Sequence, residues 1–247
     1  MPTSPKTEPS SAEITGPSRR NVWRMFDLIA PRYDLLNRLL SMRRDVAWRK
    51  ALIRKLPELS NLHVLDLATG TADVLVAMGN HPDRVSRGMG IDLSGGMLAL
   101  GQRKLSDRGL KERFPLVRGD AVSLGVADDT FDAVTVAFGI RNVLDVPAAL
   151  REMHRVLRPG GRALILEFSM PNNAAFRRGY LLYFRHILPR IGAIISGKGY
   201  AYRYLNQTVE HFPYGQAFCR LMENAGFTQI QAHPLSFGIA TIYQGEK

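Results

Sequence analysis

The 247-residue sequence has only one cysteine, Cys219. A single cysteine cannot form an internal disulfide or build a cysteine-rich zinc site, which excludes disulfide-stapled secreted scaffolds and zinc fingers. No apolar run approaches the roughly 18 to 20 residues of a membrane span, and the N-terminus lacks the apolar core of a signal peptide. We therefore expect a cytoplasmic protein with Cys219 packed in its core, and no cluster of residues suggests a metal site.

Acidic residues are also scarce, with 22 Asp and Glu against 33 Lys and Arg and a formal net charge of +11. This excess of positive charge favours an anionic partner, either nucleic acid or an acidic lipid surface, although the charge can also serve solubility alone. The 45% of hydrophobic residues and 22% of charged residues are ordinary for a globular protein, so the chain is expected to fold. Its length suits one large domain.

The first 18 residues are rich in proline and serine and contain almost no bulky apolar side chains, which predicts a disordered tail. Residues 19–247 are then a single domain. Apolar residues recur at helical spacing from Val22 and are interrupted at Pro31, which predicts two short helices. A third helix is expected from Asp45, as its N-cap, to Leu56, and the whole of 19–60 is expected to form a helical lid.

From residue 62 onward, short apolar runs alternate with helical stretches, the pattern of a mostly parallel α/β sheet with helices on both faces. A C-terminal helix is expected at 214–225, followed by two antiparallel strands that join at Pro234. The expected strands are 63–67, 87–92, 114–118, 132–137, 161–168, 227–233 and 236–244, and the expected intervening helices are 73–79, 95–107 and 146–157.

The end of the first expected strand carries an acidic residue, Asp66, and then a turn of small residues that includes Gly70 and Thr71. Small side chains allow backbone N–H groups to approach a ligand at the carboxyl end of the strand. The dinucleotide pattern G-x-G-x-x-G is absent because Gly70 is the only glycine of this turn, so NAD and FAD are poor candidates.

Asp92 ends the second strand, 22 residues after Gly70, the spacing expected of a carboxylate that accepts both hydroxyls of an adenosine ribose. Asp120 and Ala121 follow the third strand, where Asp120 is placed to accept from an adenine amino group; a simple turn-forming aspartate is the alternative. Three such strand ends favour S-adenosylmethionine, which has no phosphates and needs no glycine-rich phosphate cradle.

Five further motifs lie along residues 22–244. They are Phe26-Asp27-Leu28-Ile29-Ala30 with Tyr33-Asp34 and Asn37, Ser41 with Trp48-Arg49, Phe138-Gly139-Ile140-Arg141-Asn142, Leu166-Glu167-Phe168-Ser169 with Pro171, and Tyr202, Tyr204-Leu205 with Phe212-Pro213. Through these motifs the chain resembles the ubiquinone/menaquinone biosynthesis C-methyltransferase family of class I S-adenosylmethionine-dependent enzymes. The resemblance implies a seven-stranded Rossmann-like sheet and methylation of a ring carbon of a polyprenyl demethylquinol. The naphthoquinol is favoured, and a benzoquinol precursor of ubiquinone remains open.

The resemblance also assigns site residues. Thr71, Asp92 and the pair Asp120-Ala121 match family positions that bind the cofactor, and Tyr33 is expected to help close the lid over it. Ala137 stands where many relatives have a serine that contacts the cofactor. Ala68 and Ala72 replace glycines that are common in the loop, and Arg43 also replaces a usual glycine.

The chemistry requires a group that favours a phenolate on the quinol, because deprotonation makes the ring carbon nucleophilic. Arg141 is the candidate catalytic group, acting by electrostatic stabilisation because a guanidinium is a poor base. Water or a weak base would then take the ring proton, and Asn142 would orient Arg141. The alternative is an arginine held for structural reasons by a carboxylate such as Asp145, while His154 is expected to be a packing residue.

Residues 174–212 are expected to form a helical insertion on the substrate side. Its first part, 174–199, separates apolar from basic side chains. That strip can pack on the sheet, or it can dock on an anionic membrane surface to reach a quinol in the bilayer. Methylation of nucleic acid or of another small molecule is the competing function. Nucleic acid is disfavoured because residues 137–140 lack the Asn/Asp-Pro-Pro-aromatic turn of amine methyltransferases. Homo-oligomerisation is left open.

Overall fold

The computed structural model describes residues 22–28, 30, 38, 41, 43–171, 173–183, 208–209 and 212–247. The predicted tail at 1–18, the second predicted helix with Tyr33, and most of the predicted insertion beyond residue 183 lie outside these residues. The first predicted helix is present at 22–28.

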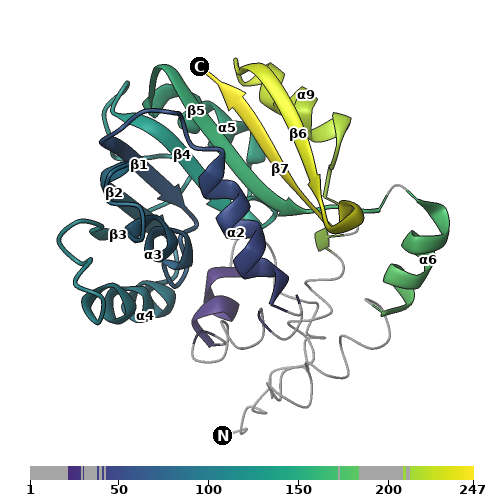
Figure 1. Cartoon of the computed structure of the whole chain (residues 1–247), viewed down its shortest axis with the longest axis horizontal. Coiled ribbons are helices and arrows are strands. Elements are labelled where there is room, and N and C mark those ends of the chain that lie inside the picture. Colours follow the sequence, from purple (N-terminus) through teal and green to yellow (C-terminus); the bar gives the residue numbers. More distant parts are fainter. Residues whose placement is uncertain are drawn as a thin grey trace, which may run out of the picture.

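A seven-stranded sheet forms the centre of the molecule, in the order β3-β2-β1-β4-β5-β7-β6 (Figure 1). The first five strands are parallel, whereas β7 runs antiparallel to both β5 and β6. This arrangement confirms the predicted class I methyltransferase sheet with its C-terminal antiparallel hairpin. The strands are β1 (Leu62–Leu67), β2 (Val85–Asp92), β3 (Leu116–Arg118), β4 (Phe131–Ala137), β5 (Leu157–Phe168), β6 (Thr228–Leu235) and β7 (Ala240–Glu246).

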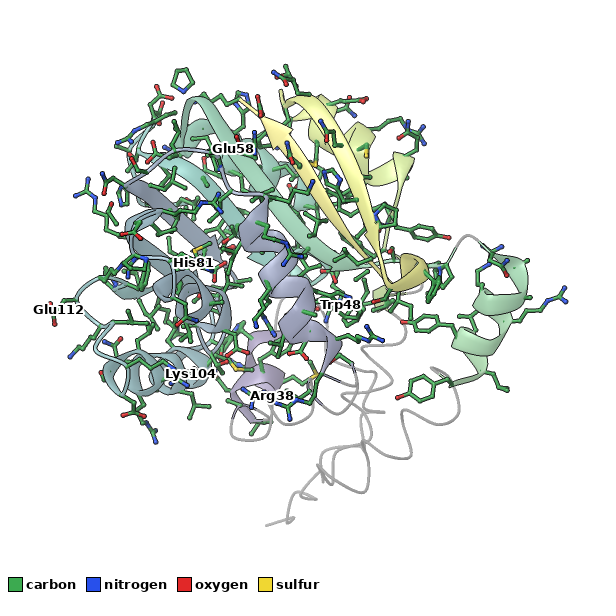
Figure 2. The ribbon with its side chains drawn as sticks, viewed as in Figure 1. Arg38, Trp48, Glu58, His81, Lys104 and Glu112 are labelled. Atoms are coloured by element: carbon green, nitrogen blue, oxygen red, sulfur yellow. The ribbon has the colours of Figure 1, made fainter. Side chains whose placement is uncertain are left out.

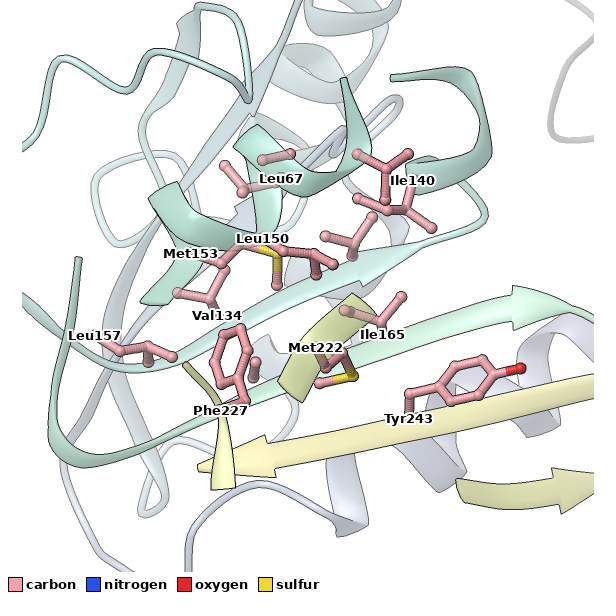
Figure 3. Close-up of a cluster of buried hydrophobic side chains, with 14 of the residues drawn as sticks. Leu67, Val134, Ile140, Leu150, Met153, Leu157, Ile165, Met222, Phe227 and Tyr243 are labelled. Atoms are coloured by element: carbon pink, nitrogen blue, oxygen red, sulfur yellow. The ribbon is translucent and has the colours of Figure 1, made fainter. Parts of the chain in front are cut away.

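Helices cover both faces of the sheet. On one face, α5 (Val146–Val156) and α9 (Gln216–Asn224) pack through Leu150, Met153 and Met222 onto inward side chains of β4, β5 and β7 (Figure 3). On the other face lie α2 (Arg44–Arg54) and α3 (Asp73–Gly79), while α4 (Gly95–Ser106) packs beside β2 and β3. A further helix, α6 (Ala174–Leu182), follows β5 at the side of the molecule (Figure 1).

Two side chains on the α5 and α9 face have the packing roles that the sequence predicts. Cys219 is buried in the core cluster of this face. The ring of His154 packs edge-on against Phe227, with the ring centroids 5.2 Å apart. Desolvation lowers the pKa of His154, which keeps this ring neutral within the packing.

Three local predictions are wrong. Asp45 is not an N-cap: Arg43 takes that position with φ 61°, and Asp45 lies inside the first turn, where it pairs with Arg49 at 2.6 Å. Pro234 lies within β6 and not at the hairpin connection, which is the short helix η4 (Ser236–Gly238). An edge strand tolerates a proline because one side of its backbone has no ladder to complete. Finally, β5 begins at Leu157 and not at the predicted residue 161, and it passes through Gly160 with φ 76°.

The parallel strands end at one edge of the sheet, and the loops that follow β1, β2, β3 and β4 meet there. The edge beyond the carboxyl ends of parallel strands, near the point where strand order reverses, is where such sheets bind ligands. Across the described residues, no helix is long and apolar enough to cross a bilayer.

Candidate functional site

A cavity of about 450 Å³ lies at this edge of the sheet. Its volume is in the range of small-molecule and cofactor sites. Most of its wall is apolar, and a few polar groups converge on it from the strand ends. The lining residues are Val22, Trp23, Phe26, Ala68, Gly70, Ile91, Asp92, Leu93, Met97, Gly119, Asp120, Ala121, Ala137, Phe138, Gly139, Asn142, Val143 and Leu144.

The loop after β1 has an alternating left-handed backbone, with φ 49° at Ala68, 55° at Gly70 and 62° at Ala72. Left-handed conformations favour glycine because a Cβ atom crowds the following carbonyl. The two alanines that replace the usual glycines therefore keep the backbone geometry of a glycine loop. The loop curls tightly enough to bring Gly70 to the wall of the cavity.

Asp92 connects this loop to the next strand. Its Oδ2 accepts a hydrogen bond from the Gly70 N–H at 2.8 Å, and its Oδ1 accepts one from the Ser94 N–H at 2.8 Å. A carboxylate offers about four acceptor positions, so capacity for further donors remains. Desolvation raises the pKa of Asp92, and the two backbone hydrogen bonds oppose that shift. A half-buried carboxylate therefore faces the cavity in a fixed orientation.

Asp66 and Thr71 lie behind the loop. Asp66 accepts hydrogen bonds from the hydroxyls of Thr69 and Thr135, both at 2.6 Å, and burial raises its pKa to about 6. Thr71 accepts a hydrogen bond from Lys104 Nζ at 2.9 Å; Figure 2 labels Lys104 on α4. Asp66 and Thr71 line a second space of about 20 Å³ that has room for roughly one water. They shape the loop from beneath and do not line the large cavity.

The third strand end contributes Asp120 and Ala121, which line the cavity as a pair. Asp120 Oδ1 accepts a hydrogen bond from the Val122 N–H at 3.2 Å, the geometry of an Asx-turn. Asp120 therefore forms the turn that the sequence offered as the alternative, and it also lines the cavity.

The fourth strand end brings Ala137, Phe138, Gly139 and Asn142 to the wall. Phe138 has φ 58°, a strained backbone conformation for a residue other than glycine. Such strain is common at functional sites, where it fixes the direction of a side chain. The Phe138 ring packs on Phe168 with centroids 4.6 Å apart and on Trp48 at 5.9 Å; Figure 2 labels Trp48 on α2. Asn142 Oδ1 is buried and has no hydrogen-bond partner among the described residues, a costly state that a ligand donor would relieve.

Arg141 does not line the cavity. Only 5% of it is exposed, and its Nη1 donates to Glu167 Oε1 and to the Phe138 carbonyl, both at 2.7 Å. The suggested pairing with Asp145 is wrong, because Asp145 caps α5 by accepting from the Ala148 N–H at 2.9 Å. The structure therefore places Arg141 behind the wall that Phe138 and Asn142 form.

The helix at 22–28 closes one side of the cavity through Val22, Trp23 and Phe26. Asp27 on this helix accepts hydrogen bonds from Ser94 Oγ at 2.5 Å and from the Gly96 N–H at 2.9 Å, at the N-terminus of α4. Sequence reasoning gave Asp27 no role, although its place in the Phe26-Asp27 motif was a signal. The Trp23 ring also stacks on the Arg118 guanidinium, whose carbon lies 5.3 Å from the ring centroid.

The donor and acceptor set of the cavity fits S-adenosylmethionine. The Asp92 and Asp120 carboxylates can accept hydrogen bonds from ribose hydroxyls and from an adenine amino group, and the apolar side chains suit the faces of a purine ring. The described residues that line the cavity include no run of successive glycines that could form a phosphate cradle.

Comparisons with known proteins point to one family. The model of the ubiE/COQ5 methyltransferase family matches residues 14–247. The ubiquinone/menaquinone biosynthesis C-methyltransferase UbiE of Geotalea daltonii is 46% identical over 224 residues, which cover 90% of this chain and 94% of that protein. The demethylmenaquinone methyltransferase of Thermus thermophilus is 44% identical over 223 residues, 90% of this chain and 100% of that protein.

A solved structure supports the fold. The crystal structure of an S-adenosylmethionine-dependent methyltransferase of Thermotoga maritima superimposes with a TM-score of 0.65. The match covers 91% of this chain and 99% of the other, at 17% identity. At that identity, the similarity concerns the fold alone.

Proposed function

This chain belongs to the ubiE/COQ5 methyltransferase family, and from that membership and its cavity we propose that it methylates a ring carbon of a polyprenyl demethylquinol. It is an S-adenosylmethionine-dependent C-methyltransferase of menaquinone or ubiquinone biosynthesis. The observation that carries the proposal is the convergence of Asp92, Asp120 and the Gly70 loop on one cavity whose remaining wall is largely apolar.

We assign the cofactor to the strand ends. Asp92 accepts from the ribose hydroxyls and Asp120 from the adenine amino group, while the Gly70 loop, shaped by Asp66 and Thr71, leaves backbone at the wall. Ala137 contributes a small side chain, which leaves room beside the loop. When bound, S-adenosylmethionine supplies an electrophilic methyl group. The chain must then align the acceptor carbon and exclude water, effects worth several kcal/mol in such reactions.

The quinol head group fits the side of the cavity formed by Phe138, Asn142 and Val143. Asn142 Oδ1, to which no residue in the described part of the chain donates, accepts the hydrogen bond of a quinol hydroxyl and so orients the ring. The Phe138 ring, fixed between Trp48 and Phe168, forms an apolar wall that excludes water from the reacting carbon. Arg141 supports this wall from behind through its bond to the Phe138 carbonyl.

The helix at 22–28 serves as the lid over the cofactor. Its docking onto α4 through Asp27 supports this role, because Asp27 accepts hydrogen bonds from Ser94 and Gly96, and the Ser94 N–H also donates to Asp92. On this basis we assign the helix at 22–28 to the lid, whereas α2, within the expected lid range 19–60, packs on the sheet through Trp48 and Leu52. Tyr33, which lies outside the described residues, is proposed as a lid residue from the family resemblance.

The edge of the sheet that holds the cavity is also the proposed membrane-docking face. Several of the large hydrophobic side chains that are exposed lie at this edge. The most exposed is Phe237, at 86%, on η4 next to the end of β5. Arg177 and Arg178 add positive charge on α6, the helix that follows β5. An anionic bilayer complements such a surface, and a polyprenyl quinol resides in that bilayer. Four exposed large hydrophobic residues lie on the helix at 22–28, on the loops after β2 and β4 and on η4, namely Leu28, Leu93, Leu144 and Phe237.

Incubation with methyl-labelled S-adenosylmethionine and a short-chain demethylmenaquinol, a demethylated benzoquinol or transfer RNA in separate reactions tests the function. We expect label on the quinol ring carbon, with the naphthoquinol as the better acceptor. Label on transfer RNA and none on either quinol would overturn the proposal.

A further inference from the structure

Glu167, at the end of β5, is a carboxylate that the proposed chemistry has not used. It is 1% exposed, and its Oε1 accepts from Arg141 Nη1 at 2.7 Å and from the Phe168 N–H at 2.8 Å. Its Oε2 lies 3.4 Å from the Arg141 backbone nitrogen, which donates to it. One carboxylate thus holds both the backbone and the side chain of Arg141.

Arg141 links Glu167 to the wall of the cavity. The same Nη1 atom donates to the Phe138 carbonyl at 2.7 Å, at the residue whose backbone is left-handed. Asn142 is the next residue in the chain, and it lines the cavity. Loss of the Glu167 contact would therefore loosen the turn that presents both Phe138 and Asn142.

The pair also determines the charge near the cavity. The Arg141 guanidinium carbon lies 5.3 Å from the centroid of Phe168, and Phe168 packs on Phe138. A lone buried guanidinium in such apolar surroundings would strongly favour an anion nearby, because screening there is weak. With Glu167 at 2.7 Å, the pair is close to neutral. The quinol hydroxyl would then feel only a small part of the arginine charge.

We propose that Glu167 is a positioning residue of the methyl transfer, which acts through Arg141 in two ways. It fixes the turn that carries Phe138 and Asn142, and it limits how far the Arg141 charge promotes ionisation of the quinol hydroxyl. This inference rests on the proposed function, since it requires a quinol in the cavity. It concerns a residue that touches neither the cofactor nor the substrate.

The test compares pH profiles of kcat for the wild type, Glu167→Gln and Glu167→Asp. Gln keeps the size but removes the negative charge, so the acid limb should move to lower pH by about one unit, a tenfold relative gain at the foot of the limb. Asp keeps the charge but shortens the reach, so the limb should stay in place while kcat falls. Affinity for S-adenosylhomocysteine should change less than about twofold in both variants.

Arg141→Gln removes the positive charge instead and leaves Glu167 as an unpaired anion. Because that anion disfavours ionisation of the quinol hydroxyl, the acid limb should move to higher pH. This variant carries the test if Glu167→Gln does not fold. Asp128→Asn is the matched control: it removes the carboxylate of the exposed Arg155 pair, with 2.6 Å between Asp128 Oδ1 and Arg155 Nη1, and should leave the profile unchanged.

A limb that stays in place in Glu167→Gln, or in Arg141→Gln where the first variant does not fold, overturns the inference, whatever the loss of kcat. So does a limb that moves the same way in both variants. Failure of the proposed function would look different, because the wild type itself would then transfer no methyl group to a quinol.

Discussion

The Gly70 N–H donates to Asp92 Oδ2 at 2.8 Å, and this bond joins the loop after β1 to the end of β2. The strands beneath it are paired in parallel, with Leu67 opposite Ile91, so the two ends are already adjacent. The carboxylate that is proposed to recognise the ribose is therefore also the group that fixes the cofactor loop. Under this proposal, recognition of the ribose and order of the loop both depend on the Asp92 side chain.

Stability should depend on the ionisation of Asp66. Burial raises its pKa in the folded state from 3.8 to about 6. A raised pKa means that the folded state binds this proton more tightly than the unfolded state. The stabilisation is present below about pH 4 and is lost as pH rises through about 6, an effect on the order of 3 kcal/mol.

Asp66→Asn removes this ionisation while it keeps the size of the side chain. Urea unfolding of both proteins between about pH 4 and 7 should show the stability of the wild type falling relative to that of the variant as pH rises. Parallel stability curves across this range would contradict the buried, elevated pKa.

The docking of the lid should depend on Gly96 and not on its neighbour Gly95. A Cβ at Gly96 would lie 3.0 Å from Asp27 Oδ1 and 3.3 Å from Asp27 Cα, whereas a Cβ at Gly95 meets nothing within 4 Å. Both positions are in the first turn of α4, so alanine adds similar helix propensity at each. We expect Gly96→Ala to weaken binding of S-adenosylhomocysteine several-fold, and Gly95→Ala to leave it unchanged. Equal affinities in isothermal calorimetry would argue against a lid held by this contact.

The loops after β1 and β4 should show steric coupling between Ala68 and Gly139. A Cβ at Gly139 would lie 2.4 Å from the Ala68 Cβ, closer than two carbon atoms can pack. Gly139→Ala should cost roughly 1 to 3 kcal/mol of stability. In the Ala68→Gly background the same substitution should cost much less, because its nearest neighbour would be Val136 Cγ1 at 3.4 Å. Additive effects in a double-mutant cycle would contradict this close approach.

Membrane docking should depend on the exposed apolar side chains at the cavity edge. Phe237→Ser removes the most exposed of them, and Leu59→Ser is the control, since Leu59 is 61% exposed in the connection before β1, at the opposite ends of the strands. Sedimentation with vesicles that contain anionic lipid should show weaker binding for Phe237→Ser only. Indistinguishable binding of both variants, or equal wild-type binding to neutral and anionic vesicles, would refute the docking face.

Much of the sheet was predictable because each strand is a short apolar run between turn signals, and because the Gly70–Asp92 spacing places two strand ends together. The position of Pro234 within a strand was not predictable. A strand tolerates a proline when it lies at the edge of the sheet, and the local sequence does not show that β6 lies outside β7.

The partners of two side chains were missed for a similar reason. Asp145 was the nearest carboxylate in sequence to Arg141, but the parallel pairing of Ala137 with Leu166 brings Glu167 to the turn after β4. Asp27 meets Gly96 across 69 positions of sequence, through docking of a helix on the N-terminus of another. Periodicity predicts elements, whereas such contacts depend on how the elements assemble.

The most direct test of the central claim is the calorimetric titration of S-adenosylhomocysteine into the wild type and Asp92→Asn, with Asp107→Asn at the end of α4 as a control. Our account predicts one site in the wild type, an affinity at least tenfold weaker in Asp92→Asn, and no change in the control. Identical isotherms for the wild type and Asp92→Asn, or no binding by a folded wild type, would contradict it.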